Sequence, residues 1–114
     1  MQIQVTTDNH IQGSAELTQH VESVVESAMS RFGRRITRVE VHLADEASSA
    51  KSRDNDKSCV MEARLAGMQP ITVRANGASV EQALDSAADK LEKTLDRTLG
   101  KQDHAKGRPS FSGE

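Results

Sequence analysis

The chain has 114 residues, 28% of them charged, and a formal net charge of −2 at pH 7, which favours one domain and excludes no class of partner. No segment approaches the roughly 20 apolar residues of a membrane helix, and the opening MQIQVTTDNH lacks a basic or long apolar stretch, so we expect neither a membrane span nor a signal peptide. With two Phe, no Tyr and no Trp, the core must be mostly aliphatic, and the single Cys59 excludes an internal disulfide and favours the reducing cytoplasm.

The first two predicted elements are a strand and a helix. Ile3 and Val5 alternate with polar residues in MQIQVTT, which is the period of a half-buried strand. Ser14 is a suitable N-cap for a helix over about residues 15–32, and Gly33 is a suitable stop. The apolar side chains of this helix form one stripe, made of Leu17, Val21, Val24, Val25, Ala28, Met29 and Phe32.

Three further strands are predicted before the second helix. Apolar alternation indicates a strand over about residues 37–44, and DEASSAKSRDND (45–56) then has no apolar residue larger than Ala, so we expect a mobile hairpin loop. The third strand, in KSCVMEARLAG, carries its apolar residues on one face: Cys59, Met61, Ala63 and Leu65. The fourth strand is ITVRA (71–75), after which we expect a turn at Asn76-Gly77.

A second helix is predicted from Ser79, which forms a capping box with Gln82. Its apolar stripe consists of Val80, Ala83, Leu84, Ala87, Ala88, Leu91, Leu95 and Leu99. Periodicity is lost at Gly100, so residues 101–114 are expected to be a disordered polar tail after a domain of residues 1–100. The element order β-α-β-β-β-α predicts an α+β fold, with one four-stranded sheet and both helices packed on one face.

The charges of the second helix are predicted to segregate around its axis. With Leu84 at zero, the acids fall at roughly 60–140° and the bases at roughly 180–260°, instead of being interleaved for i,i+4 pairing. The acids are Glu81, Asp85, Asp89, Glu92 and Asp96, and the bases are Lys90, Lys93, Arg97 and Lys101. The bases span about 16 Å of helix axis and could meet several phosphates, but spacing alone leaves a solvated surface equally open.

A second basic cluster lies in RFGRRITR, which contains Arg31, Arg34, Arg35 and Arg38 and no acid. It is a candidate second contact for a polyanion, or solvated charge. Because the chain lacks Tyr and Trp, RNA contact would be mainly to phosphates and shape instead of through base stacking.

No catalytic or metal site is predicted. The four His residues have no metal-ligand spacing, Cys59 is expected to pack as a small apolar residue, and Asp8-Asn9-His10 is typical of a turn. Asp85 and Asp89 lie on an exposed helix edge where nothing would raise a pKa for acid–base catalysis. We therefore expect no cofactor, no small-molecule substrate and no enzymatic activity.

The segments MQIQVTTDNHIQGSAEL, ITVRANG and VEQALDSAADKLEKTL, with the element order, resemble the ribosome hibernation promoting factor family, which includes ribosome-associated inhibitor A and the sigma-54 modulation proteins. The resemblance runs from Met1 to about Lys101 and is strongest in ALDSAADKLEKTLDR, where the family has A-[IL]-D followed by D-K-L-x-[RK]. It implies a fold like the double-stranded-RNA-binding domain with an extra N-terminal strand. It also implies binding to the small ribosomal subunit, over the messenger and transfer RNA sites, which keeps the ribosome idle.

In that family the second helix presents basic residues to ribosomal RNA, and the matching positions here are Lys90, Lys93, Arg97 and Lys101. The long-form members carry a C-terminal dimerisation domain that this chain is too short to hold, so we expect a monomer. The chain departs from the family at the first helix, where Val24 and Ser27 stand near positions that usually carry Lys or Arg, and where Glu22 and Glu26 add negative charge. A second interpretation is therefore a divergent paralogue that acts as a protein-interaction or regulatory module with little RNA affinity.

Overall fold

The computed structural model describes residues 1–46 and 56–105, the last five of these by their backbone alone. In chain order the elements are β1 (Gln2–Thr7), α1 (Ala15–Met29), the short 3-10 segment η1 (Ser30–Arg35), β2 (Ile36–Asp45), β3 (Lys57–Leu65), β4 (Ile71–Gly77) and α2 (Val80–Ala105). The predicted order β-α-β-β-β-α is confirmed. Most of the hairpin loop that we expected to be mobile, and residues 106–114 of the expected tail, lie outside the described residues.

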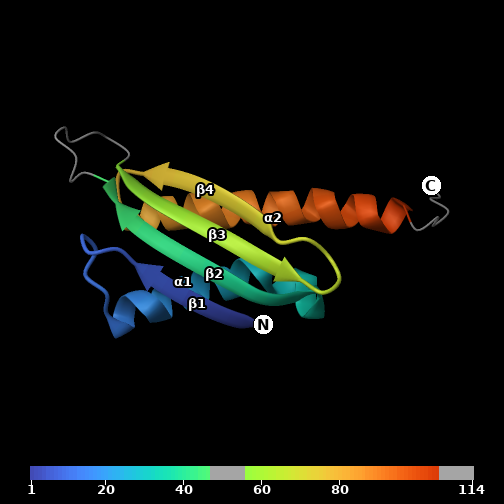
Figure 1. The fold of residues 1–114 in the computed structure, drawn as a ribbon, viewed down its shortest axis with the longest axis horizontal. Coiled ribbons are helices and arrows are strands. Elements are labelled where there is room, and N and C mark those ends of the chain that lie inside the picture. The colour runs from blue at the N-terminus through green and yellow to red at the C-terminus, as the bar shows by residue number, and fades with distance from the viewer. Residues whose placement is uncertain (47–55, 106–114) are drawn as a thin grey trace.

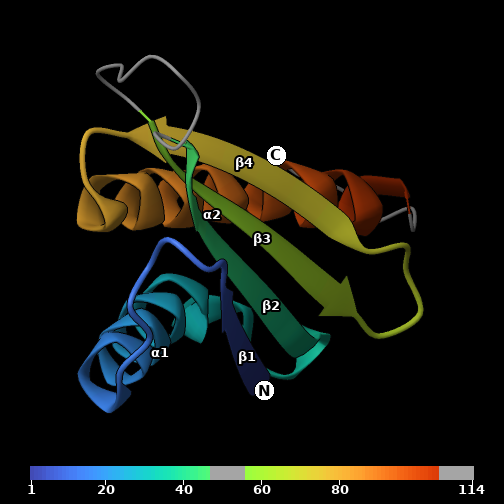
Figure 2. The ribbon, with the colours of Figure 1, turned by 60° about the vertical axis from the view of Figure 1, so that its left-hand side comes forward.

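The strands form one four-stranded sheet in the order β1-β2-β3-β4. β1 is parallel to β2, whereas the β2–β3 and β3–β4 pairs are antiparallel. A parallel pair needs a crossover connection, which α1 provides, and α2 packs against β3 and β4. Figures 1 and 2 show both helices on the same side of the sheet, which confirms the predicted α+β architecture.

The hydrophobic core lies between the sheet and the two helices. The inward-facing side chains of β2 and β3 are buried, and Val41, Leu43, Cys59 and Met61 among them are at most 1% exposed. The helices cover them with Val21, Val25, Met29, Ala83, Leu84, Ala87, Ala88, Leu91, Leu95 and Leu99. Both predicted apolar stripes are therefore confirmed. Four of their members are only partly buried at the margin of the core: Leu17, Val24, Ala28 and Val80.

Helix α1 begins as predicted but ends earlier. The Ser14 hydroxyl accepts a hydrogen bond from the Leu17 backbone N–H at 3.0 Å, which confirms the N-cap. The helix was expected to reach Phe32, yet its last residue is Met29 and the chain tightens into η1. Within η1, Gly33 has φ of 58°, a left-handed conformation that suits glycine, and Phe32 is buried. The tighter segment keeps Phe32 in the core while the chain turns into β2.

The start of α2 depends on a close approach of two backbone segments. The Ser79 hydroxyl accepts from the Gln82 N–H at 3.1 Å, as in the predicted capping box, while the Gln82 side chain accepts from the Ala78 N–H at 3.0 Å instead of from Ser79. The turn expected at Asn76-Gly77 is wrong, because both residues belong to β4. A Cβ at Gly77 would lie 2.7 Å from the Ala83 backbone nitrogen, so this approach requires glycine.

The far end of α2 also differs from the prediction. The helix continues through Gly100 to Ala105, so residues 101–105 are helical and do not belong to the expected tail. Gly100 does not have the positive φ of a left-handed helix stop; among the described glycines only Gly33 and Gly67 do. Figure 1 shows this end of α2 extending beyond the sheet.

Candidate nucleic-acid interface

The exposed side of α2 carries two rows of charge. The acidic row consists of Asp85, Asp89, Glu92 and Asp96, and the basic row consists of Lys90, Lys93 and Arg97. Lys101 continues the spacing of the basic row along the helix, but its side chain is not among those described. Because the buried stripe of α2 faces the sheet, both rows lie on the part of the helix that solvent reaches.

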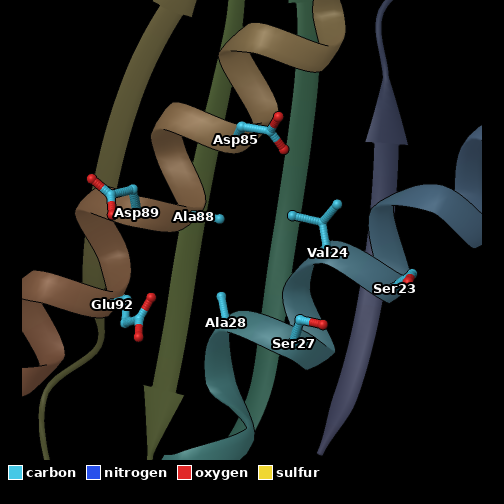
Figure 3. Close-up of a pocket in the computed structure, with 8 residues that line it drawn as sticks. All are labelled: Ser23, Val24, Ser27, Ala28, Asp85, Ala88, Asp89 and Glu92. Carbon is cyan, nitrogen blue, oxygen red and sulfur yellow. The ribbon is translucent and has the colours of Figure 1, made fainter.

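The acidic row faces α1. Asp85, Asp89 and Glu92 line one wall of a groove of about 440 Å³ whose other wall belongs to α1. The α1 wall contributes Ser23, Val24, Ser27 and Ala28, and Ala88 completes the lining from α2 (Figure 3). The acids of α2 therefore lie in the groove between the two helices.

The basic row lies on the opposite flank, toward β4. Lys90 Nζ donates a hydrogen bond to the backbone carbonyl of Arg74 on β4 at 2.8 Å. Lys93 and Arg97 are exposed, and Arg97 makes no ion pair with any side chain in the described part of the chain. The structure thus brings the three predicted bases of α2 together along one edge.

The two rows are joined at one point, which corrects the expected absence of i,i+4 pairing. Lys93 Nζ lies 3.0 Å from Asp89 Oδ2, four residues earlier in α2. Both side chains are highly exposed, at 72% and 60%, so this pair is weak and open to exchange with solvent or a ligand.

Arg31 lies on the α1 side of the acidic row, away from the basic row. Its Nε donates to Glu92 Oε2 at 3.2 Å and its Nη1 donates to Asp96 Oδ1 at 3.1 Å. The guanidinium also stacks over Phe32, 4.8 Å from the ring centre. The hydrogen bond to Asp96, assisted by the charges of Asp96 and Glu92, raises the pKa of Arg31 despite some desolvation.

The other arginines of the second basic cluster diverge. Arg34 and Arg35 are exposed on η1, and Arg35 shares a cavity of about 440 Å³ with Arg31 and Asp96 at the junction of η1 and α2. Arg38 projects from the face of the sheet opposite the helices, where it contacts Gln4 and Glu40. The structure therefore does not bring Arg38 to the basic row, because residues alternate between the two faces along β2.

The remaining candidates agree with structural roles. Cys59 is fully buried, and desolvation raises the pKa of its thiol to about 12, so it is not a thiolate at neutral pH. The Asp8 carboxylate accepts from the backbone N–H of His10 at 3.0 Å, which confirms the turn, and from that of Asp45 at 3.1 Å. Desolvation alone would raise the pKa of Asp8, but these hydrogen bonds with the help of His10 outweigh it, so the pKa is lowered.

Residues 1–46 and 56–100 contain no group of three or more His, Cys, Asp or Glu side chains that could hold a metal ion. Of the helices in the described segments, none combines the length and apolar character needed to cross a bilayer.

Sequence reasoning missed two contacts that shape this surface. The link between Arg31 and α2 joins residues 61 and 65 positions apart, and the link from Lys90 to β4 depends on how α2 lies across the sheet. Neither leaves a periodic signal in the sequence. Glu92 and Asp96, which pair with Arg31, are visible as acids in the sequence. Their distance from Arg31 along the chain hides the pairing.

The geometry can be compared with known proteins. Among the solved structures that share the fold is a ribosomal subunit interface protein from Coxiella burnetii, with a TM-score of 0.70 and 19% identity; the match covers 88% of this chain and 99% of that one. Another is the N-terminal domain of Protein Y from Thermus thermophilus, with a TM-score of 0.68 and 18% identity; the match covers 86% of this chain and 99% of that one. No curated sequence matches the chain significantly. The family model for sigma 54 modulation protein / S30EA ribosomal protein matches residues 3–103, almost the whole described fold. The chain therefore belongs to the sigma 54 modulation protein / S30EA ribosomal protein family.

Proposed function

We propose that the protein is a ribosome-associated translation inhibitor that binds ribosomal RNA of the small subunit through the basic row of α2. The observation that carries this proposal is the alignment of Lys90, Lys93 and Arg97 along one exposed flank, over about 10 Å of helix axis. Membership of a ribosomal protein family, and the printed name of the Coxiella relative as a subunit interface protein, support the choice of partner.

The chemistry of the row favours contacts to phosphates. Lys and Arg supply donors and positive charge, and the chain has no Tyr or Trp on which bases could stack. Three phosphate contacts would make the affinity fall roughly thirtyfold between 50 and 200 mM salt. The protein would act as a monomer in the cytoplasm, by occupying a site on the ribosome without catalysis. Lys101 would extend the same row by another turn of α2, and Arg34 and Arg35 would add contacts from η1.

A second candidate function is a protein-interaction or regulatory module with little RNA affinity. It is favoured by the negative charge on the helical side of the molecule, where the acidic row lines the groove beside α1. Because phosphates are repelled by carboxylates, this groove opposes RNA binding across both helices at once. The two functions differ in whether the protein sediments with small subunits at low salt.

The test is co-sedimentation with purified bacterial small ribosomal subunits at 50 and 200 mM salt. The wild-type protein should bind at low salt and dissociate at high salt, and the double charge reversal Lys93→Glu with Arg97→Glu should abolish binding while circular dichroism and the melting temperature stay unchanged. Unchanged co-sedimentation of this variant would reject the basic row as the site. Absence of wild-type binding even at low salt would favour the second function.

A matched control separates the basic row from net charge. The variant Lys93→Gln with Arg97→Gln removes two positive charges from α2, and Arg64→Gln with Arg74→Gln removes two from the opposite face of the sheet, where both side chains are 52% exposed. The first pair should weaken binding at least tenfold more than the second, because only the α2 cations would face phosphates. Equal losses would mean that total charge alone governs binding.

A further inference from the structure

Arg31 is held at the edge of the candidate interface by two carboxylates. Two of its donor groups, at Nε and Nη1, are taken by Glu92 and Asp96 at 3.2 and 3.1 Å. The guanidinium also lies over the Phe32 ring, 4.8 Å from its centre, and this contact helps to hold the group beside the two carboxylates. The two N–H groups that point at Glu92 and Asp96 cannot at the same time bind the oxygens of a phosphate, and the two carboxylates repel a phosphate that approaches the remaining donors of Arg31.

We propose that Glu92 and Asp96 act as an internal substitute for phosphate, which withholds Arg31 from RNA and thereby limits the affinity of this protein for the ribosome. The inference rests on the proposed function, and it assigns to two acids of α2 the role of negative determinants of binding. It explains how a chain of this family can carry acids beside its basic row, because the acids set how much of the basic surface is available.

The ion pairs are accessible enough to be exchanged. Arg31 is 51% exposed, Glu92 35% and Asp96 59%, so water and counterions reach all three groups. Exposed ion pairs of this kind contribute little to stability, and a phosphate could compete with them. The cavity beside Arg31, lined also by Arg35, Leu99 and Gly100, leaves room of about 440 Å³ through which a nucleic-acid backbone could approach.

The position of the acids matters as much as their contacts. Asp96 and Glu92 lie between Arg31 on one side and the basic row on the other, so they separate two positively charged patches on the helical side of the molecule. Neutralising them would join these patches into one surface running from η1 across α2. General relief of repulsion and release of Arg31 would both raise affinity, but only the second depends on the Arg31 side chain.

The experiment is a double-mutant cycle measured by co-sedimentation with small ribosomal subunits at 50 to 200 mM salt. The variant Glu92→Gln with Asp96→Asn keeps the shape of both side chains and their ability to accept a hydrogen bond, so the fold should persist, which a melting curve checks. This variant should bind more tightly than wild type. Its affinity should also fall about threefold more steeply between 50 and 200 mM salt, as expected for one additional phosphate contact.

The cycle is completed by Arg31→Ala in both backgrounds. If Arg31 is released, the substitution should remove the additional salt dependence of the neutralised variant and should weaken that variant at least threefold more than it weakens the wild-type protein. The proposal is overturned if Glu92→Gln with Asp96→Asn raises the affinity equally with Arg31 present and with Arg31→Ala. The higher affinity would then come from reduced repulsion alone. No gain at all would overturn it as well.

The failure of this inference can be told apart from failure of the proposed function. If Lys93→Gln with Arg97→Gln reduces binding but the neutralised variant gains nothing, only the internal competition is wrong. If the wild-type protein does not bind, the neutralised variant decides. Binding by that variant that is lost with Arg31→Ala would still support the internal competition. No binding by that variant would reject both the internal competition and the proposed function.

Discussion

Solvent reaches both charged flanks of α2, but the two flanks meet different neighbours. The acidic row faces the groove beside α1 and provides the carboxylates that hold Arg31, whereas the basic row faces β4 and leaves Arg97 without an ion pair among the described side chains. A single helix therefore presents one flank whose carboxylates hold Arg31, and one flank whose bases contact β4 through Lys90 and Asp89 through Lys93. Charge segregation in a sequence does not by itself show which flank is which, because that depends on where the next helix packs.

The largest expected effect on stability comes from the buried side of α2, which stabilises the fold, and not from its two charged flanks. Leu95 is fully buried, so Leu95→Ala should lower the free energy of unfolding by about 3 kcal/mol. Arg97→Ala, two residues along on the exposed basic row, should change it by less than about 0.5 kcal/mol. Urea denaturation of the two variants measures the difference, and similar losses would mean that the basic row is structural.

The next largest effect concerns the N-cap of α2, at the end of the helix where both charged flanks begin. Ser79→Ala removes the hydroxyl that accepts from the Gln82 N–H, and should cost about 1 kcal/mol of stability. Ser86→Ala, at an exposed position inside α2, provides the control and should have the opposite sign, stabilising by about 0.4 kcal/mol. Denaturation midpoints that move in the same direction for both variants would contradict a capping role for Ser79.

A smaller effect tests how far the basic row extends. Gly100 lies inside α2, and in the described part of the chain no atom beyond its neighbours and its own helix backbone lies within 4 Å of an added Cβ. Gly100→Ala should therefore stabilise the protein by about 0.7 kcal/mol and increase helical circular dichroism. Had Gly100 been the helix stop that the sequence suggested, alanine would destabilise. A stabilising result places the backbone of Lys101 in the same continuous helix as Lys90.

The smallest effect concerns the ion pair that joins the two rows. Asp89→Asn removes the charged partner of Lys93, whose Nζ lies 3.0 Å away, and should change stability by no more than about 0.5 kcal/mol because both groups are highly exposed. Thermal unfolding monitored by circular dichroism is sufficient. A loss above about 1 kcal/mol would show that the flanks stabilise each other, contrary to their separate roles.

Much of the fold could be predicted from the sequence because its signals are local. The stripe of Val21, Val25 and Met29 in α1, and the alternation of Cys59, Met61 and Ala63 in β3, follow from the periods of a helix and a strand. The caps at Ser14 and at Ser79 with Gln82 involve residues three positions apart. Such patterns are fixed by backbone geometry before any tertiary contact forms.

The errors arose where tertiary packing outweighed local preference. Gly33 and Gly100 both suggested helix ends, but α1 ends earlier so that Phe32 can pack in the core, and α2 continues through Gly100 without a left-handed residue. Gly77 was assigned to a turn, yet it serves a close approach of β4 to α2. Glycine marks a position with special backbone demands, and only the neighbours decide which demand applies.

The sequence by itself determined the order of the elements, the two buried stripes and the existence of an acidic and a basic row on α2, because each depends on residues within a few positions of one another. The tertiary structure alone decided what the rows contact. It turned the acids toward α1, brought Arg31 to Glu92 and Asp96 across more than 60 residues, and placed Arg38 on the opposite face of the sheet. The physical reason is that the charge of a helix flank is set by its own side chains. The residues that this flank contacts are set by how whole helices and strands pack against one another.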